Sequence, residues 1–593
     1  GVRAIEPHLS GNDQELLQAI LFSECDFILN GYPTVAAINA HTHKNKPESN
    51  IWNACMLFRT AMLYDHLPAR NACLEKATEL FLNGISIPAD SESTELYEGK
   101  PLKDWHIGPN FTENMALHHH CYLNVGYMVI CLSHLAMLHA FCKERNIAVP
   151  PAALLHAREL WQLVKTLTFS DGRLWRIGGD TRVRYCYCQD YALPTWLWAE
   201  EMFGDGDAAS LVQGWAGIIE TEQASNVDSS FFGNRLDELH AVSPIYYFRL
   251  EGDRACCVSM ARWWQHQAQK PAPCAPQTGD LPAFKSWQDD FHGAYVSRGK
   301  ERFASWVWES AQRPAGQCIP SGQSDMYESQ FNMAGLLVGI GCKTETELVE
   351  HRGDSFAGGF ATSGTYDWKM LEDPADSSLD LTFARSRTVA IALPDDATFV
   401  VFQRAWTLIS CYVNGIYGLN LHLPNDIFNG GSRRCQLDGR EVILRSLQAE
   451  SGNLSGRKLS IDDCMSVNLL SPGNLKVLTP ASRTINLYKR HAMTFAGKGG
   501  SLYSNPIVVN PCQEQRRFVA NEELMDLAVV VRVGKAAKAP VQAEMISANC
   551  MKITGANGKH YSIAANPSEL SIDLSDVAQN LSVISGKTTS LEP

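Results

Sequence analysis

The sequence predicts a multidomain protein in which helices come first and antiparallel β-sheets follow, and three observations indicate this. The chain has 593 residues, more than one hydrophobic core usually supports. Apolar residues recur every three or four positions over 1–270, and every second position beyond that range. Between the two parts lies the proline-rich stretch 269–276, which is unsuited to continue a helix. We therefore expect a helical domain at 1–270, a large sandwich at 280–515 and a small β domain at 516–593.

The first part of the chain predicts one helix after another. Clusters of Gly, Pro and Asn separate the apolar periodic segments, as at 30–33 and 203–206. Helical hairpins repeated in this way bury their apolar faces against one another, in a bundle, a solenoid or a closed (α/α) toroid. The predicted helices are 12–28, 51–64, 70–84, 112–145, 151–167, 190–203, 207–222 and 252–267.

The second part predicts strands. Apolar and polar residues alternate within short segments, and turns rich in Gly and Asn separate them, which is typical of a large antiparallel sandwich. The clearest of these segments are 293–298, 302–308, 388–393, 398–402 and 527–532. Strands near 526–533, 541–546 and 570–574 indicate the smaller C-terminal β domain.

Composition excludes several classes of function. The chain is 45% hydrophobic and 19% charged, as in soluble globular proteins. A membrane span needs about 20 unbroken apolar residues, and the most apolar helix, 125–141, contains Ser133, His134 and His139, so we expect a buried helix and no membrane partner. A net charge of −13 argues against nucleic acid as a partner. The 18 cysteines are scattered, which favours buried thiols over a disulfide framework.

The segment 111–124 carries three consecutive histidines, His118, His119 and His120, at the start of the longest predicted helix. On a helix, Asn114 shares a face with His118, and His120 shares one with Asn124. Each residue turns the helix by about 100°, so the three imidazoles cannot all face the core. A hydrogen-bonded helix start without chemistry and a catalytic or ligand-binding role are the two interpretations. A metal site would need further ligands.

The segment 171–194 is a glycine-rich loop that runs into a predicted helix near Gln189. It is either a surface loop with stacked Arg–Tyr pairs or a site for an anionic sugar, in which Arg pairs with a carboxylate or sulfate. A local basic cluster of this kind can act on a polyanion despite the negative net charge. Its arginines and tyrosines are Arg173, Arg176, Arg182, Arg184, Tyr185, Tyr187 and Tyr191.

Two segments of the β part, 324–335 and 364–371, are rich in polar and aromatic residues. The first contains Tyr327 and Asn332 and is either the wall of a cleft or an ordinary strand edge. Trp105 and Trp175 are of a type that stacks on sugar faces, although each is more often a core residue.

Together these segments resemble the toroid-plus-sandwich polysaccharide lyases, namely the heparinase II/III-like, alginate lyase and chondroitin/hyaluronan lyase families. The domain order matches, and 120–122 is similar to the His-small-aromatic part of their Asn-His motif. The stretch 187–194 is similar to their tyrosine-bearing segment, and 366–369 and 328–335 to motifs of their β domain. The chain departs at His119, where those families often have Asn, and at Cys188, near the expected catalytic tyrosine.

The resemblance implies β-elimination on a polysaccharide that contains uronic acid, with glycosaminoglycans the first expectation and alginate or another polyuronate the next. The implied catalytic residues are Asn114, with Asn124 as its alternative, His118, His119, His120, Tyr187 and Tyr191. The implied substrate-binding residues are Trp105, Arg182, Arg184, Tyr327 and Asn332. This chemistry requires no cofactor, and structural zinc or calcium stays open.

Two other functions stay open. A glycoside hydrolase on the same helical scaffold would need a pair of carboxylic acids, for which Asp180 and Asp190 are the candidates. A non-catalytic carbohydrate-binding protein would bind the polysaccharide without cleaving it. The chain opens at Gly1 without a signal peptide, and we expect a processed N-terminus and a secreted or periplasmic location.

Overall fold

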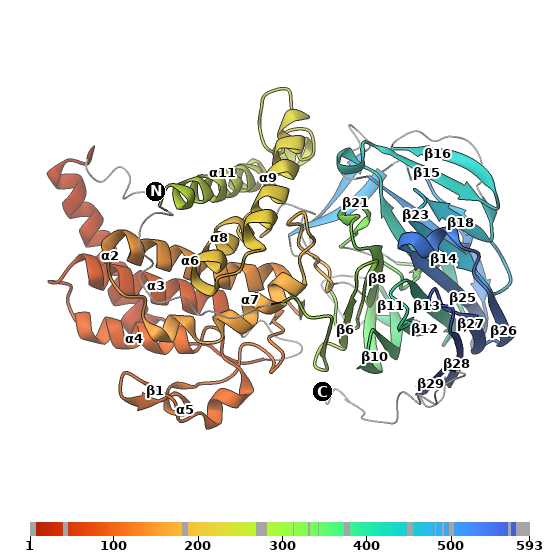
Figure 1. Ribbon diagram of the computed structural model, residues 1–593, viewed down its shortest axis with the longest axis horizontal. Helices are drawn as coiled ribbons and strands as arrows, with labels where there is room; N and C mark the ends of the chain where they lie inside the picture. Colours follow the sequence, from red (N-terminus) through yellow and green to blue (C-terminus); the bar gives the residue numbers. More distant parts are fainter. Residues whose placement is uncertain are drawn as a thin grey trace.

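The computed structural model describes residues 8–38, 45–180, 188–267, 282–311, 313–329, 332–341, 343–372, 380–446, 455–480, 482–488, 491–496, 503–566 and 571–576. Helices fill one side of the molecule and sheets the other (Figure 1). Every strand pair in the described chain is antiparallel. The predicted order, helices first and antiparallel sheets after them, is confirmed.

The helical part is built around one central helix. This helix, α6 (Val125–Arg145), packs against α3, α7 and α8, and its neighbours pack in turn on the next helices along the chain. The first helix shows why such segments start where they do, because Ser10 and Asp13 form a capping box that satisfies its free N–H groups. The other helices are α2 (Gly11–Gly31), α3 (Pro47–Leu63), α4 (Arg70–Leu82), α5 (Leu102–Trp105), α7 (Ala157–Thr166), α8 (Ala192–Phe203), α9 (Ala208–Ala224), α10 (Asp237–Val242) and α11 (Pro244–Gln267), with short 3-10 turns η2 (Pro88–Glu92) and η3 (Pro151–Leu154).

Among the described residues, α6 is the one helix whose length and composition would suit a membrane span, yet most of it is buried inside the helical part. Its polar residues have partners there. The Ser133 hydroxyl donates to the Ile130 carbonyl at 2.8 Å, and His139 lies 3.2 Å from Glu201. The buried helix that the sequence predicts is therefore present.

Two large sheets form the sandwich. The first has the strand order β10 (Lys343–Phe356), β11 (Gly359–Leu371), β12 (Leu381–Ala392), β13 (Thr398–Thr407), β25 (Glu523–Val533), β19 (Met465–Leu469), β18 (Lys458–Ile461), β15 (Ser432–Leu437) and β16 (Arg440–Arg445). The second has the order β17 (Ser455–Gly456), β20 (Leu475–Val477), β23 (Ser504–Cys512), β14 (Cys411–Pro424) and β24 (Arg516–Phe518), with β9 (Leu336–Gly339) also paired to β14.

Smaller sheets complete the described chain. One holds β5 (Ser286–Asp289), β6 (Ala294–Arg298), β7 (Arg302–Val307) and β8 (Ala315–Pro320), and another holds β26 (Ala543–Ser547), β27 (Cys550–Thr554), β28 (His560–Asn566) and β29 (Ser571–Asp576). Two-stranded ribbons are β1 (Leu96–Tyr97) with β2 (Lys100–Pro101), β3 (His118–His119) with β4 (Tyr122–Leu123), and β21 (Ser482–Tyr488) with β22 (His491–Ala496). The 3-10 turns of this half are η4 (Ser324–Met326), η6 (Ile427–Asn429) and η7 (Gly534–Lys538).

Strand β25 belongs to the nine-stranded sheet, although the sequence predicts it in the small β domain. The sequence places the boundary at residue 516, but β25 is a central strand of the nine-stranded sheet. Alternate residues of a strand point to opposite faces. Here Val529 and Val531 join the main core, whereas Ala528 and Val530 pack with β27 and β28. The strand is apolar on both faces because it is covered on both, and only β26 to β29 form the separate small sheet.

The predicted helix 112–145 is wrong in its first third. Residues 112–116 form a turn, in which the Ala116 N–H donates to the Thr112 hydroxyl at 3.1 Å, and a hairpin follows before α6 begins. Met115 has a φ of +62°, which a right-handed helix cannot contain. The hairpin is also paired to the β half, since the Leu123 N–H donates to the Glu309 carbonyl at 3.2 Å. Helical spacing alone gives no sign of that distant partner.

Several cysteines of the described chain are buried in its core. The buried cysteines of the described chain include seven unbridged thiols, which agrees with the expectation of small apolar side chains in a core. Burial raises the pKa of the Cys55 thiol to about 11, so it is a poor nucleophile. These residues are Cys25, Cys55, Cys73, Cys131, Cys257, Cys318 and Cys435.

Candidate active site

The three histidines lie on the hairpin formed by β3 and β4. Its register pairs His119 with Tyr122 and His118 with Leu123, so His120 and Cys121 are the two connecting residues. Both have left-handed backbone conformations, with φ of +58° and +67°. A two-residue hairpin of this kind favours Asn-Gly, and each other residue held there costs about 1 kcal/mol. The turn thus carries an imidazole and a thiol at two positions whose backbone conformation favours Asn or Gly.

The three imidazoles differ in their exposure to solvent. His118 and His119 are buried, at 1% and 5% exposure, whereas His120 at the tip is half-buried. The His120 ring lies 4.3 Å from that of His119 and 5.0 Å from that of Tyr127, between centroids, in edge-to-face geometry. Tyr127 belongs to the first turn of α6. Two imidazoles and a phenol are therefore in mutual contact, and His120 is the imidazole best placed to meet a ligand.

Behind this group, Asn45 and Glu48 fix His119. The Asn45 amide donates to the His118 carbonyl, which turns its oxygen toward Nδ1 of His119 at 3.4 Å. An amide oxygen only accepts, so His119 carries its proton on Nδ1 and has a basic Nε2. The Glu48 carboxylate lies 3.8 Å from that Nε2, and burial raises the pKa of Glu48. The Glu48 carboxyl group therefore faces Nε2 of His119 within ion-pair distance.

Asn124, the residue offered as an alternative to Asn114, is the N-cap of α6. Its side-chain oxygen accepts from the Tyr127 N–H at 3.2 Å, and its amide donates to the His119 carbonyl at 3.4 Å. Asn114 is exposed in the turn before the hairpin, where its carbonyl accepts from the Trp287 indole at 3.1 Å. Because 112–124 is not helical, neither predicted i,i+4 pair exists. Asn124 supports the hairpin through the backbone.

The arginine-rich loop reaches the same junction through Arg176, which forms a buried ion pair with Asp180. Burial alone would lower the pKa of the Arg176 guanidinium. The neighbouring groups outweigh burial, so its pKa is raised; these groups are Asp180, Cys188, Tyr327 and Tyr122. Cys188 lies against the start of α6, because a Cβ added to Gly126 would be 3.1 Å from the Cys188 Cβ. Both described flanks of 181–187 thus lie beside the hairpin. The predicted Arg182, Arg184 and Tyr187 are outside the described residues.

The β half supplies residues that sequence reasoning missed. His292, in the turn after β5, lies with Nε2 3.2 Å from Nδ1 of His118, and Asp289 lies 2.6 Å from Nδ1 of His292. An Asp three residues before a His, in the turn sequence 289–293, was the available signal. Asn45 and Glu48 gave none, because they come from the start of α3 and meet the hairpin only through the fold.

Two predicted residues are packed elsewhere. Trp105 is buried, with its indole donating to the Tyr97 carbonyl at 3.1 Å and Lys100 over its ring at 4.3 Å. Tyr191 precedes α8, and burial together with the Asp253 carboxylate raises the pKa of its phenol well above the ordinary value. Trp105 is thus a core residue in the described structure, and Tyr191 is poorly suited to act as a base.

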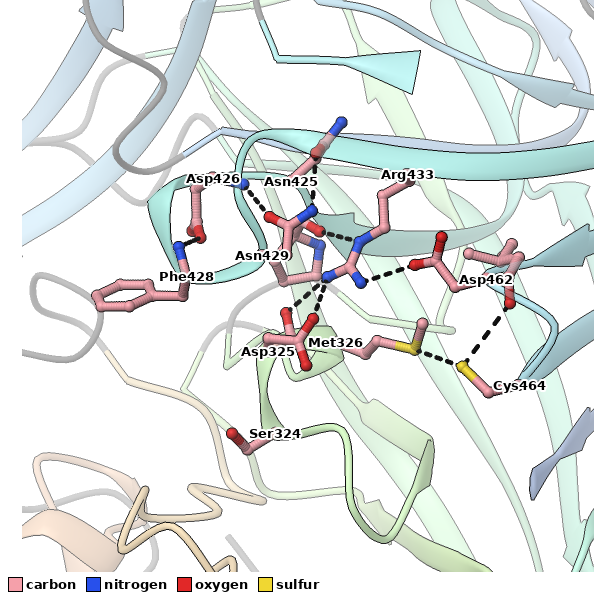
Figure 2. A network of polar contacts seen from close by, with 12 residues as sticks. Ser324, Asp325, Met326, Asn425, Asp426, Phe428, Asn429, Arg433, Asp462 and Cys464 are labelled. Atoms are coloured by element: carbon pink, nitrogen blue, oxygen red, sulfur yellow. Dashed lines mark hydrogen bonds and ion pairs between the residues drawn. The ribbon is translucent and has the colours of Figure 1, made fainter. Parts of the chain in front are cut away.

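The segment 324–329 joins the two halves of the molecule. Figure 2 shows Arg433 of β15 between two carboxylates, Asp325 of η4 at 2.7 Å and Asp462 at 2.9 Å. Next to Asp325, Ser324 donates to Asp171 of the helical half. Arg433 therefore anchors a turn that holds the start of the arginine-rich loop.

Tyr327 completes this contact. Its buried hydroxyl donates to the Arg176 carbonyl at 3.0 Å and accepts from the Arg176 N–H at 2.9 Å. Asn332 is likewise buried, with its amide 2.9 Å from the Gln317 oxygen and its own oxygen 3.2 Å from the His422 N–H. Both residues that we predicted to bind substrate thus make interior hydrogen bonds.

The Tyr327→Phe variant is expected to lose about 2 kcal/mol of stability, because the buried Arg176 N–H loses its partner and the Arg176 carbonyl keeps only the Gly179 N–H at 2.9 Å. Chemical denaturation measures this loss. The matched control is Tyr412→Phe, at an exposed tyrosine, which should stay within about 0.5 kcal/mol of the parent. Equal stability of the two variants would contradict the described role of Tyr327.

The carboxylates proposed for a hydrolase are engaged in ion pairs. Asp180 pairs with Arg176, and Asp190 accepts from the Trp215 indole at 2.8 Å and from Arg254 at 2.9 Å. Arg254 also binds Glu222 at 2.8 Å. Each of the two aspartates is thus held in an ion pair of its own.

Within the part of the chain that the structure describes, no group of three or more His, Cys, Asp or Glu side chains has the arrangement of a metal site.

Comparison with known proteins gives likeness in fold only. No family model matches the chain. No curated protein matches it in sequence. Among solved structures, it is similar to a mutant of the heparan sulfate lyase of Pedobacter heparinus, with 9% identity over 93% of this chain and 79% of that one and a TM-score of 0.29. It is also similar to the α-galactosidases of Lactobacillus brevis, with 8% identity over 41% and 40%, and of Geobacillus stearothermophilus, with 7% identity over 42% and 41%, each with a TM-score of 0.26. Likenesses of this size say nothing of the activity of this chain.

Proposed function

We propose that this chain is a polysaccharide lyase that cleaves a polymer containing uronic acid by β-elimination at the histidine hairpin. The observation that carries the proposal is the strained turn, which holds His120 half-buried against Tyr127 and His119. Strained non-glycine residues persist where function needs their side chains. A sheltered cluster of imidazole and phenol groups is suited to proton transfer at neutral pH.

In the proposed reaction His120 takes the C5 proton of the uronic acid. His119, which lies 3.8 Å from the Glu48 carboxylate, is in ring contact with His120 and can stabilise the charge as His120 becomes imidazolium. The departing O4 oxygen needs a proton donor, and Tyr127 is the phenol in ring contact with His120. Tyr187 is proposed from the sequence alone as a second candidate for this proton donor.

The carboxylate of the sugar must also be neutralised, because the C5 proton is only weakly acidic while that charge is present. Arg176 is already paired with Asp180, so it is not assigned this role. Arg182 and Arg184 are assigned to it from the sequence, as bidentate partners of carboxylate or sulfate. Glycosaminoglycans are the proposed first substrate, and alginate or another polyuronate the next. The protein is proposed to act in a secreted or periplasmic setting without a cofactor.

The test is incubation with a panel of polymers, namely heparan sulfate, chondroitin sulfate, hyaluronan, alginate, ulvan and glucuronan. The expected result is ultraviolet absorbance from a conjugated enoate with at least one of them, and none with a neutral glucan. New reducing ends without that absorbance would identify a hydrolase. Binding to a polymer without any cleavage would identify a carbohydrate-binding protein, and either result would overturn the proposal.

A further inference from the structure

We infer that Asp289 and His292 of the β half form a hydrogen-bonded relay with His118, which orients the histidine hairpin for the reaction; this inference rests on the proposed function. The carboxylate of Asp289 lies 2.6 Å from Nδ1 of His292, and Nε2 of His292 lies 3.2 Å from Nδ1 of His118. Asp289 also accepts from the His292 backbone N–H at 3.0 Å, which fixes the carboxylate against the turn.

The relay assigns a proton to each ring nitrogen along it. The Asp289 carboxylate only accepts, so His292 carries a proton on Nδ1 and, when neutral, presents a lone pair at Nε2. That lone pair accepts from Nδ1–H of His118, which leaves Nε2 of His118 basic. All three side chains are buried, so water does not compete for these hydrogen bonds. One carboxylate thereby fixes the tautomer of an imidazole two residues before the tip of the hairpin.

Aromatic and imidazole rings pack around His292 and His118. Phe291 packs edge-on against the His118 ring with a centroid distance of 5.4 Å, and the His292 and His118 rings lie with centroids 5.2 Å and planes 28° apart. His351 stacks on Trp308 nearby, and burial lowers its pKa to about 4. His351 is therefore neutral at working pH. The carboxylate hydrogen-bonded to His292 is that of Asp289.

Both strands of the hairpin are tied to the β half at this point. Strand β3 is held through the His118–His292 hydrogen bond, and β4 through the Leu123 N–H on the Glu309 carbonyl. His120 lies at the tip of the hairpin, between these two attached strands. The candidate site, on the helical half in sequence, is thus complete only with the β half in place. Asp289 and His292 are positioning residues that act through His118.

The relay can be tested on the parent protein without any activity assay. In protein labelled with ¹⁵N-histidine, nuclear magnetic resonance is expected to show His118 as the neutral Nδ1–H tautomer, with a scalar coupling across the hydrogen bond to Nε2 of His292. The variants His118→Asn and His292→Gln assign the two rings. A His118 ring protonated on Nε2, or no coupling to His292, would overturn the relay.

Kinetics then test its effect on the reaction. His292→Phe and Asp289→Asn are each expected to lower kcat about ten- to hundredfold while KM stays within about twofold, because orientation and proton transfer are lost but the substrate contacts remain. His292→Gln should recover part of kcat, since its amide oxygen can accept from His118. His351→Gln, at the neighbouring buried imidazole, is the matched control and should leave kcat within about twofold of the parent.

The failures of the two proposals are distinguishable. If the parent cleaves no polyuronate, the proposed function fails, and the resonance measurement still decides the relay. If the parent cleaves but folded His292→Phe and Asp289→Asn keep the parent kcat, the inference is overturned and the function stands. Circular dichroism and the melting temperature establish that each variant is folded, and the coupling in the parent decides the relay where a variant does not fold.

Discussion

The variant His120→Asn is expected to abolish elimination while keeping or raising the stability of the fold. Asparagine adopts the left-handed conformation more readily than histidine, so the turn should gain up to about 1 kcal/mol. The same change removes the half-buried imidazole that we assign as the base, and kcat/KM is expected to fall at least about 10³-fold. Steady-state absorbance assays and denaturant titration measure the two effects on the same samples.

Two control variants distinguish the loss of the His120 imidazole from the change in the turn's backbone. Cys121→Gly relieves the second strained position while keeping His120, so it should stabilise the protein by about 1 kcal/mol and retain activity. His134→Asn removes a half-buried imidazole from α6, where it contacts Trp52, and should retain activity as well. Activity in His120→Asn near the parent value would refute the assignment of the base.

Replacing Arg254 by methionine is expected to destabilise the helical half by about 3–5 kcal/mol, the range for a buried charge that loses its partner. Arg254 has 0% exposure and bridges Asp190 of the 188–191 turn to Glu222 of α9. Its guanidinium also lies 3.8 Å from the centroid of the Phe232 ring. Methionine fills much of the volume but leaves two buried carboxylates with fewer donors. Denaturant unfolding, followed by tryptophan fluorescence, measures the loss.

The matched control is Arg249→Met on the same helix, α11, at an exposed arginine whose ion pair with Asp253 spans 3.6 Å. Exposed pairs of this kind contribute at most about 1 kcal/mol. Comparable losses for the two variants would contradict the role given to Arg254. Asp190→Asn tests the same network from the other end: if Asp190 is structural, this variant loses stability, and elimination per folded molecule is retained.

The order of the domains could be predicted from the sequence because it depends on the local spacing of apolar residues. Helical spacing placed α2, α3, α4, α8 and α9 within a few residues of their bounds, and alternation placed β6, β7 and β13. The exception is instructive: 112–124 has helical spacing but forms a turn and a hairpin. The competing interactions are the pairing of Leu123 with Glu309, nearly two hundred residues away, and positive φ values at Met115, His120 and Cys121.

The candidate site could be predicted only in part, for a related reason. A run of three histidines is visible in one sequence, and it does lie at the junction of the two halves. Its partners come from three separate stretches: Asn45 and Glu48 before and within α3, Tyr127 in α6, and Asp289 at the end of β5 with His292 after it. Conversely, Tyr327 and Asn332 have residue types suited to sugar binding, and only the fold shows that their polar atoms are used internally.

The most direct measurement of the central claim is the fate of water during cleavage. β-Elimination breaks the bond to O4 without adding oxygen from solvent, whereas hydrolysis adds one. Cleavage of a polyuronate in H₂¹⁸O, followed by mass spectrometry before the new anomeric hydroxyl exchanges its oxygen with water, is therefore expected to give unsaturated products without ¹⁸O at the cleavage site. Products that contain solvent ¹⁸O, or intact polymer throughout the panel, would contradict the assignment of this chain as a lyase.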